Sequence, residues 1–334
     1  MSAKIDKIIA RLQEKTAEGT YYEAHQQTRV VASRYIKAQN YPAATDILYN
    51  VSLSLLRAAQ GGSGGDLALF LLEVYNLSAL TCDSVSKGRL LTLLRAFHPE
   101  EPSRKRFVGE VIAWSSKNSV FPAGDPELHH VVGTLYADEG EAYDAERHLV
   151  LGTKDSAEVL AKMEFEWYVE DDSHTAALYA SRAVLPYLLV GNVRDARKSL
   201  GIFTSRLQEE NKGLTVQELG GSGIEDIKIY PSLPLLNFLG LLLVAVQKGN
   251  SLDFKQLTKK YAGQMKEGAG EMWEEALVGI AEMYFGIQRP RQGNPLMDMM
   301  GSMFGGGMGG GGQQKQGAKR IGQNGEAPMA EGLD

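Results

Sequence analysis

The sequence predicts an all-α protein folded as an α-solenoid, with about fourteen helices and one β-hairpin near residues 214–230. Three observations support this fold class. Apolar residues recur at the three- and four-residue spacing of amphipathic helices along most of the chain. Alternating patterns, which are typical of strands, are almost absent elsewhere. A short turn motif that joins pairs of helices recurs along the chain.

The helical stripes follow one another from the N-terminus. The first three consist of Ile5, Ile8, Ile9 and Leu12, of Val30, Val31, Arg34 and Tyr35, and of Leu48, Val51, Leu55 and Leu56. A fourth consists of Leu67, Phe70, Leu71, Val74 and Leu77. We expect Asp66, Ser103 and Ser251 to cap helices, because short polar side chains accept the free N–H groups of a helix start. The glycine clusters at 61–65 and 220–223 are predicted to be loops.

The recurring turn has the pattern G-x-x-x-[DE]-A. It occurs at 19–24, 140–145 and 191–196, and residues 39–44 form a degenerate copy. We expect the glycine to end one helix in a left-handed conformation, and the alanine to let the next helix pack closely on the first. Such turns at irregular spacing indicate a divergent, tetratricopeptide-like, right-handed solenoid, whose extended surface is suited to binding other proteins.

One segment breaks the helical pattern. Apolar residues alternate on both sides of the glycines at 220–223, at Leu214, Val216, Leu219, Ile227 and Ile229. Two such arms predict a hairpin over 214–230, which must pack on other elements because an isolated hairpin is only marginally stable. The residues leave two interpretations open: an ordered connector lying on its own helices, or a finger that grips a partner.

Composition excludes several classes of protein. The chain has 334 residues, of which 43% are hydrophobic and 23% charged, as in ordinary globular domains. A net charge of −6 argues against a general nucleic-acid binder, which needs a strongly basic surface. The one cysteine, Cys82, cannot form an internal disulfide and suits a reducing cytosol. No signal peptide or membrane-spanning apolar run is evident, so we expect a cytosolic protein without membrane insertion.

Composition also separates a tail from the folded part. Residues 287–334 are rich in glycine and methionine and show no periodicity, so we predict a disordered tail. The folded part is divided into an N-terminal half, residues 1–150, and a C-terminal half, residues 151–286.

Catalytic chemistry is not evident. Residues 61–65 match G-x-S-x-G, but a nucleophile elbow needs a preceding strand, and here a helix precedes the serine. The histidines are scattered, which does not favour a metal site, and no cofactor motif is found. An enzyme that uses Ser63 or the histidines is therefore a rival hypothesis without a supporting motif. Acidic residues gather around Trp167 and are interpreted as a solvated helix end, with a docking patch as the alternative: Glu164, Glu166, Glu170, Asp171 and Asp172.

Several short segments, taken in order, resemble the Golgi to ER traffic protein 4 family. They are Tyr21-Tyr-Glu-Ala-His25, Phe107-Val108, Trp114-Ser-Ser116, Pro234-Leu-Leu-Asn-Phe238, Leu241–Val246, Phe254 with Leu257 and Tyr261, and Tyr284-Phe-Gly286. The resemblance covers nearly all of residues 1–290. The glycine-methionine tail is similar to that of filamentous-fungal members.

The resemblance implies a non-enzymatic adaptor of the guided-entry pathway for tail-anchored membrane proteins. Members of the family are α-solenoids that pair with a ubiquitin-like-domain subunit. The pair connects a tetratricopeptide co-chaperone, which carries tail-anchored proteins, to the cytosolic targeting ATPase for insertion into the ER membrane. The family's N-terminal half contacts the ATPase and favours its ATP-bound form. Its C-terminal half, including a hairpin, holds the ubiquitin-like subunit.

Carried over to this sequence, the resemblance assigns residues to each partner. For the ATPase we expect basic and polar residues of the first two helices: Lys7, Arg11, His25, Arg29 and Tyr35. For the ubiquitin-like subunit we expect residues of the hairpin and the helix after it: Leu214, Val216, Ile227, Ile229, Leu235, Leu236 and Phe238. These apolar residues are equally suited to a core, above all Leu235 and Phe238. The alternative function is a tetratricopeptide-like scaffold subunit of another cytosolic complex.

Overall fold

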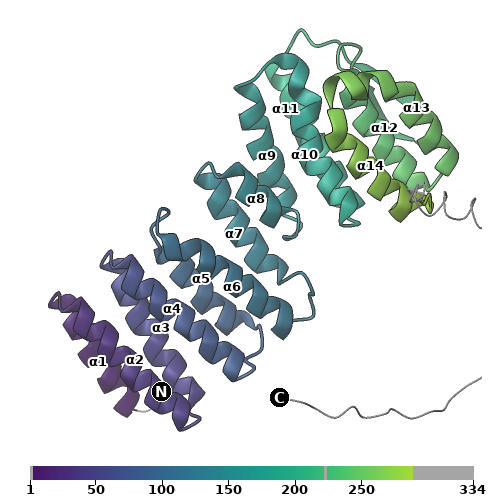
Figure 1. Ribbon diagram of the computed structural model, residues 1–334. Coiled ribbons are helices and arrows are strands. Elements are labelled where there is room, and N and C mark those ends of the chain that lie inside the picture. Colours follow the sequence, from purple (N-terminus) through teal and green to yellow (C-terminus); the bar gives the residue numbers. More distant parts are fainter. Residues whose placement is uncertain (1–2, 222–223, 289–334) are drawn as a thin grey trace, which may run out of the picture. The chain divides into compact units, whose positions relative to one another are not determined.

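The computed structural model describes residues 3–221 and 224–288, which form fourteen α-helices and one pair of antiparallel strands (Figure 1). The helices are α1 (Ala3–Ala17), α2 (Tyr21–Lys37), α3 (Tyr41–Arg57), α4 (Gly61–Leu77), α5 (Ser84–Ala96), α6 (Pro102–Asn118), α7 (Pro126–Asp138), α8 (Ala142–Leu149), α9 (Ser156–Val169), α10 (Ala176–Leu189), α11 (Val193–Glu210), α12 (Pro234–Lys248), α13 (Ser251–Gly268) and α14 (Gly270–Phe285). A short 3₁₀ helix, η1 (Ser173–Thr175), precedes α10. Strands β1 (Gln217–Gly221) and β2 (Ile224–Ile229) follow α11. The predicted all-α solenoid with one hairpin is confirmed.

The helices pack mainly on their near neighbours in the sequence. α3 packs on α2 and α4, α7 packs on α8, and α11 packs on α9 and α10. Successive pairs of this kind define a solenoid. The chain as far as Gln288 is one compact unit. The division at residue 150 falls between α8 and α9 and stays a prediction, and residues 289–334 of the predicted tail lie outside the described residues.

The recurring turn has the geometry that the sequence predicts. The glycine lies in the left-handed region in each full copy, with φ of +79° at Gly19, +76° at Gly140 and +80° at Gly191. The alanine five residues later is fully buried in each copy, at Ala24, Ala145 and Ala196. In the degenerate copy, Gln39 takes φ +56° and Ala44 is fully buried. The backbone therefore keeps the same turn where the glycine is missing.

The predicted loop at residues 61–65 is wrong, because these residues form the first turns of α4. They belong to a further copy of the recurring turn, in which Ala59 takes φ +58° and Gly64 stands in place of the buried alanine. A Cβ atom at Gly64 would lie 2.9 Å from the backbone nitrogen of Leu56 in α3. The glycine thus allows a closer approach of the two helices, and its role is packing instead of flexibility.

The predicted helix caps also differ from the observed ones. Glu101 caps α6 and Asn250 caps α13, each from just before the helix, so Ser103 and Ser251 lie inside their helices. Asp66 lies within α4 and bonds to side chains of α2. Glu101 and Asn250 accept the first N–H groups in place of the two serines. Asp66 instead bonds to the charged or polar side chains of His25 and Arg29.

The acidic residues near Trp167 are not all part of a solvated helix end. Glu166, Glu170, Asp171 and Asp172 are exposed, as expected, but Glu164 is fully buried. Burial and the neighbouring Glu146 raise the pKa of Glu164, which keeps its carboxyl neutral at pH 7. Leu160, one turn earlier on α9, is also fully buried, so Glu164 shares the inner face of the helix.

The core runs along the solenoid and contains large side chains from most of the helices. The largest of the fully buried ones include Trp114, Trp273, Tyr75, Tyr187 and Phe107. Cys82 is half-buried against this core, and burial raises the pKa of its thiol to about 11. Within residues 3–221 and 224–288, no helix combines the length and the apolar character needed to cross a bilayer.

The close approach of α3 and α4 predicts opposite effects for two alanine substitutions. Gly64→Ala should destabilise the fold by about 2 kcal/mol, because the added methyl group overlaps Leu56. Gly62→Ala is the matched control, since a Cβ atom there meets nothing within 4 Å. It should stabilise α4 by up to about 1 kcal/mol, because alanine favours the helix. Urea denaturation measures both changes, and equal effects would contradict the packing argument.

Candidate partner-binding surfaces

The first helix has a basic stripe on its outer side. Ile5, Ile9 and Leu12 are buried against the rest of the fold, whereas Lys7 and Arg11 are exposed. These two residues are one turn apart on α1, so their side chains share one face. Neither forms an ion pair with another residue in the described part of the chain. The stripe therefore presents two uncompensated positive charges to solvent.

The second helix contributes a charged cluster with α4. The Asp66 carboxylate accepts hydrogen bonds from Nε2 of His25, at 2.7 Å, and from a guanidinium nitrogen of Arg29, at 2.5 Å. The Arg29 guanidinium also lies 5.1 Å from the centre of the Phe70 ring. Partial burial acts to raise the pKa of Asp66, but the bonds from His25 and Arg29 outweigh it and hold this pKa below its usual value.

A shallow hollow of about 390 Å³ lies on the outer side of α2. Its lining combines three basic side chains with polar and apolar ones: Gln26, Arg29, Val30, Ser33, Arg34 and Lys37. Arg34 and Lys37 are exposed, and Val30 exposes half of its surface. The predicted ATPase residues thus separate into groups. His25 and Arg29 meet at Asp66, whereas Tyr35 is half-buried against the core.

Sequence reasoning missed part of this surface. Lys37 was not among the candidates, although it follows Arg34 by three residues and lines the same hollow. The helical spacing of the two basic residues was the available signal. Asp66 was misassigned as a cap, and no sequence pattern connects it with His25, which lies 41 residues earlier.

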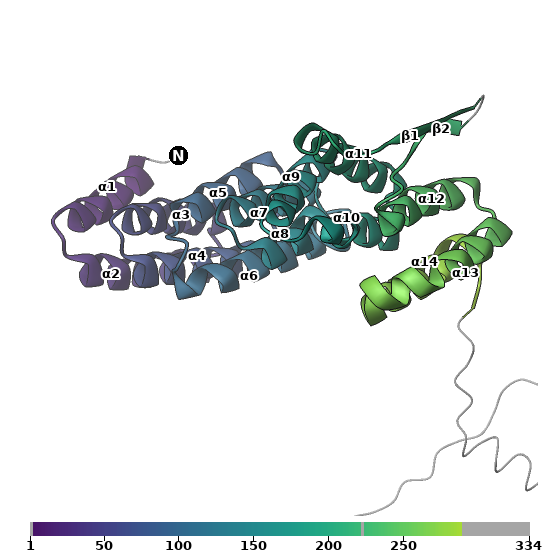
Figure 2. The same cartoon turned by 90° about the horizontal axis from the view of Figure 1, so that it is seen from above.

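The hairpin is the second candidate surface. β1 and β2 pair antiparallel, with Gln217 opposite Ile229 and Glu218 opposite Lys228, and the register shifts between Leu219 and Gly221. Figure 2 shows the strands extending away from α11 and α12. β2 contacts α12 at the base of the hairpin. The hairpin is therefore attached to the solenoid at one end.

A buried polar contact fixes that attachment. The backbone N–H of Tyr230 donates to Oδ1 of Asn237, at 2.7 Å, and Nδ2 of Asn237 donates to the Tyr230 carbonyl, at 2.8 Å. Gln208 of α11 bonds to the Tyr230 hydroxyl, and Lys228 donates to Gln208. Tyr230 and Asn237 are both buried, so the two bonds between them are shielded from water. The base of the hairpin is thereby bonded to α11 and α12.

The predicted apolar residues of this region occupy different environments. Leu214, Val216 and Leu235 are half-buried against the core, and Ile229 is half-buried. The side chain of Ile227 lies outside the described part, although its backbone pairs with Leu219.

Two of the predicted residues are buried in the solenoid itself. Leu236 is 2% exposed, and Phe238 is fully buried, with its ring 5.6 Å from Tyr261 and 5.7 Å from Trp273. A partner that docks on the surface does not reach these side chains. They support α12 from inside the core, as the alternative interpretation of these residues anticipated.

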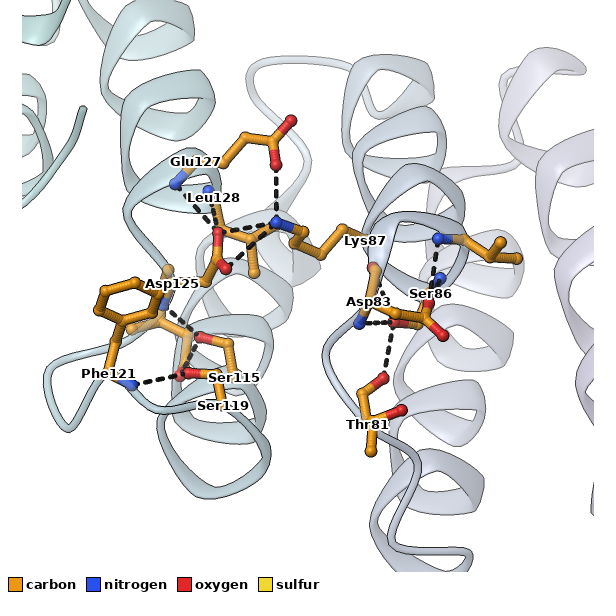
Figure 3. Close-up of polar contacts among 12 residues, drawn as sticks. Thr81, Asp83, Ser86, Lys87, Ser115, Ser119, Phe121, Asp125, Glu127 and Leu128 are labelled. Carbon is orange, nitrogen blue, oxygen red and sulfur yellow. Dashed lines mark hydrogen bonds and ion pairs between the residues drawn. The ribbon is translucent and has the colours of Figure 1, made fainter. Parts of the chain in front are cut away.

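The connection between α6 and α7 is a further exposed feature that sequence reasoning missed. Val120 is 87% exposed and Phe121 is 43% exposed. Figure 3 shows the polar contacts around this connection, in which Phe121 N–H donates to Ser119 and Asp125 N–H donates to Ser115. Lys87 of α5 bonds to Asp125 and to Glu127. No sequence pattern distinguished these apolar residues from ordinary loop residues.

A metal centre is not indicated among the residues that the structure describes. In that part of the chain, no three His, Cys, Asp or Glu side chains are placed to hold an ion. His129 and His148 bond to each other through their Nδ1 atoms, at 3.0 Å, and His129 donates from Nε2 to the Ala123 carbonyl. Burial lowers the pKa of both histidines, so they are neutral at pH 7.

Comparisons with known proteins identify the family of the chain. A family model described as Golgi to ER traffic protein 4 matches residues 38–304. Golgi to ER traffic protein 4 of Aspergillus fumigatus is 53% identical, over 94% of this chain and 94% of its own length. The Schizosaccharomyces pombe protein of the same name is 34% identical, over 92% of this chain and 96% of its own. The crystal structure of C. therm. Get4 is 60% identical with a TM-score of 0.83, over 91% of this chain and 96% of that one.

The chain belongs to the Golgi to ER traffic protein 4 family. Membership confirms the resemblance found in the sequence and connects the chain with traffic between the Golgi and the ER. The matched range of the Golgi to ER traffic protein 4 model contains the hairpin and α12–α14, whereas α1 and α2 precede it.

The bonds of Asn237 predict how firmly the hairpin is held. Asn237→Ala should destabilise the protein by about 2 kcal/mol, because two buried hydrogen bonds to the Tyr230 backbone are removed, while the Tyr230 carbonyl keeps its bond from the Leu233 N–H. It should also speed proteolysis within 214–230. Asn76→Ala is the control, since Asn76 bonds only to its own helix, at Leu72. If both variants match the parent protein in urea denaturation and in proteolysis, Asn237 does not anchor the hairpin.

Proposed function

We propose that this protein is a non-enzymatic adaptor in the cytosol. With a ubiquitin-like-domain subunit, it bridges a tetratricopeptide co-chaperone, loaded with a tail-anchored membrane protein, to the targeting ATPase for insertion into the ER membrane. The observation that carries the proposal is the presence of two unlike surfaces on one solenoid of this family. One is the basic outer side of α1 and α2, and the other is the anchored hairpin after α11.

The basic side of α1 and α2 supports the assignment of the ATPase. Lys7 and Arg11 are exposed without ion pairs in the described residues, and Arg34 and Lys37 line the neighbouring hollow. Free cations of this kind steer an acidic partner toward the surface and raise the rate of association. Arg29 is partly neutralised by Asp66, so its role in this proposal is to shape the surface.

The hairpin supports the assignment of the ubiquitin-like subunit. Its base is fixed by Tyr230 and Asn237, while the strands extend from the helices (Figure 2). A strand pair offers backbone groups and alternating side chains to an added segment, which is a common way to bind a peptide. The half-buried residues Leu214, Val216, Ile229 and Leu235 lie around this base. In this proposal they form the edge of the subunit's binding site.

Positioning explains how such an adaptor acts without bond chemistry. The hairpin holds the subunit that recruits the loaded co-chaperone, and the N-terminal side holds the ATPase. Transfer of the client then takes place within one assembly, at an effective concentration set by the scaffold. The solenoid contributes a fixed spacing between the two surfaces.

Reversal of two charges tests the ATPase surface. The double substitution Lys7→Glu with Arg11→Glu should weaken ATPase binding about tenfold or more, or ~1.4 kcal/mol, because two attractive charges become repulsive. The loss should shrink at high salt. Calorimetry with the ATP-bound ATPase measures the affinity. Arg147→Glu is the control, since Arg147 is 82% exposed on α8. An unchanged affinity at low salt, or an equal loss in the control, contradicts the assignment.

Shortening the hairpin tests the subunit surface. Glu218 and Lys228 are paired, so residues 219–227 can be replaced by Asn-Gly, which closes two antiparallel strands in a tight turn. The Tyr230–Asn237 contact is left in place, and the free energy of unfolding should change by less than about 0.5 kcal/mol. Binding of the ubiquitin-like subunit should be lost in gel filtration. A complex that still elutes intact shows that the hairpin is not the binding element.

A further inference from the structure

Three aromatic side chains form a row on the surface where α8, α9 and α10 meet. The rings of Tyr143 and Trp167 lie edge to face with centres 5.4 Å apart, and those of Trp167 and Tyr179 lie edge to face at 5.6 Å. Tyr143 is 66% exposed, and the other two are half-buried. Each helix contributes one ring, so the row crosses three neighbouring helices. We call these three side chains the aromatic row.

A half-buried polar network fixes the aromatic row from the protein side. The Arg182 guanidinium lies 5.0 Å from the centre of the Tyr143 ring and 4.8 Å from that of Trp167. Glu146 accepts two hydrogen bonds from Arg182, at 2.5 and 2.8 Å. Glu164 is fully buried 3.5 Å from Arg182, and neither of its carboxyl oxygens has a hydrogen-bond partner in the described residues.

The spacing along each helix explains why these groups meet. The pairs Tyr143 with Glu146, Glu164 with Trp167, and Tyr179 with Arg182 are each three residues apart. Residues at this spacing lie on one face of a helix. The three faces converge, and Arg182 directs its charge inward to Glu146. The Arg182 charge behind the aromatic row is therefore already paired with Glu146.

The same region holds much of the negative charge of the protein. Between Asp138 and Asp172 there are twelve Asp and Glu residues but three Lys and Arg residues. Several of these carboxylates are paired, such as Asp144 with Lys105 and Glu166 with Arg206. The turn after α9 is different, because its acidic side chains are exposed.

That turn lies next to the aromatic row. Asp171 accepts a hydrogen bond from the Tyr179 hydroxyl, at 3.0 Å. Glu170 and Asp172 flank it, and neither forms an ion pair in the described residues. The cations near the row are Arg182, paired with Glu146, Lys105 and the exposed Arg147, which both meet Asp144, and Arg206, paired with Glu166. His174 is also exposed nearby on η1. The surface beside Tyr179 is thus negative overall.

We propose that the aromatic row and the acidic turn bind an arginine-rich segment of a partner protein. Guanidinium groups stack on the exposed ring of Tyr143 beside Trp167, as Arg182 does from the protein side, and neighbouring basic side chains meet Glu170 and Asp172. Aromatic rings favour cations over their faces, and arginine stacks better than lysine because its charge is planar and weakly hydrated. The site is distinct from the basic side of α1 and α2, which has the opposite charge, and from the hairpin.

The protein carries its own reporter for the test. Trp114 and Trp273 are each 1% exposed, whereas Trp167 is half-buried at the surface. A change in tryptophan fluorescence on titration therefore reports on the aromatic row. The probes are hexa-arginine, hexa-lysine and hexa-glutamate peptides, at low and at physiological salt. We expect hexa-arginine to bind several times more tightly than hexa-lysine, and hexa-glutamate to give no change.

Substitutions separate stacking from general attraction. Tyr143→Ala should weaken hexa-arginine binding about fivefold in calorimetry, within the range of one cation–ring contact. The double substitution Glu170→Gln with Asp172→Asn should weaken it by about the same factor, because two attractive charges are removed. The controls are Tyr22→Ala, an exposed tyrosine on α2, and Glu14→Gln with Glu18→Gln, exposed acids of the N-terminal end. Circular dichroism confirms that each variant is folded.

Three results overturn the proposal. The first is that hexa-arginine does not bind at low salt. The second is that the arginine and lysine peptides bind equally and Tyr143→Ala has no effect. The third is that the control variants lose as much affinity as the variants at the site. The opposite results support it. None of them bears on ATPase or ubiquitin-like subunit binding, so the proposed function stands or fails separately.

Discussion

The structure depends on one steric constraint, the small buried residue that follows each left-handed turn. Ala24, Ala44, Ala145 and Ala196 are fully buried, and Gly64 takes the same position where α4 begins. A larger side chain at these positions forces two helices apart. Because each helix pair sets the position of the next, a displacement of the helices at one turn shifts all the helices that follow. The distance between the N-terminal helices and the hairpin therefore depends on these small contacts.

The fold class was predictable because it rests on repetition, whereas several local features were not. The recurring turn and the apolar stripes each appear many times, so single exceptions do not hide them. The glycines at 61–65 were misread because flexible loops and tight helix contacts both favour glycine, and only the position of Leu56 distinguishes the two. Glu164 was misread because a buried carboxyl requires Glu146 and Arg182, which lie elsewhere in the sequence.

The candidate surfaces were predictable by region more than by residue. Charge and helical spacing placed Lys7 and Arg11 on an exposed face, but they gave no sign that Asp66 engages His25 and Arg29. Alternation predicted the strands of the hairpin, while the anchoring role of Asn237 depends on the fold around it. An apolar residue in a helix of a solenoid is suited both to a core and to an interface, and only burial decides. Phe238 is the clearest example.

The order in which the helices pack has a consequence for local stability. Among the residues that the structure describes, α1 packs chiefly on α2 and α3, so it has neighbours on one side only. End units of a solenoid open more readily than internal ones, and their backbone amides exchange hydrogen with deuterium faster. A protein that binds the outer side of α1 and α2 would slow this exchange, and part of its binding energy would be used to hold the terminal pair closed. Binding at this end therefore depends on how well the terminal helices stay folded.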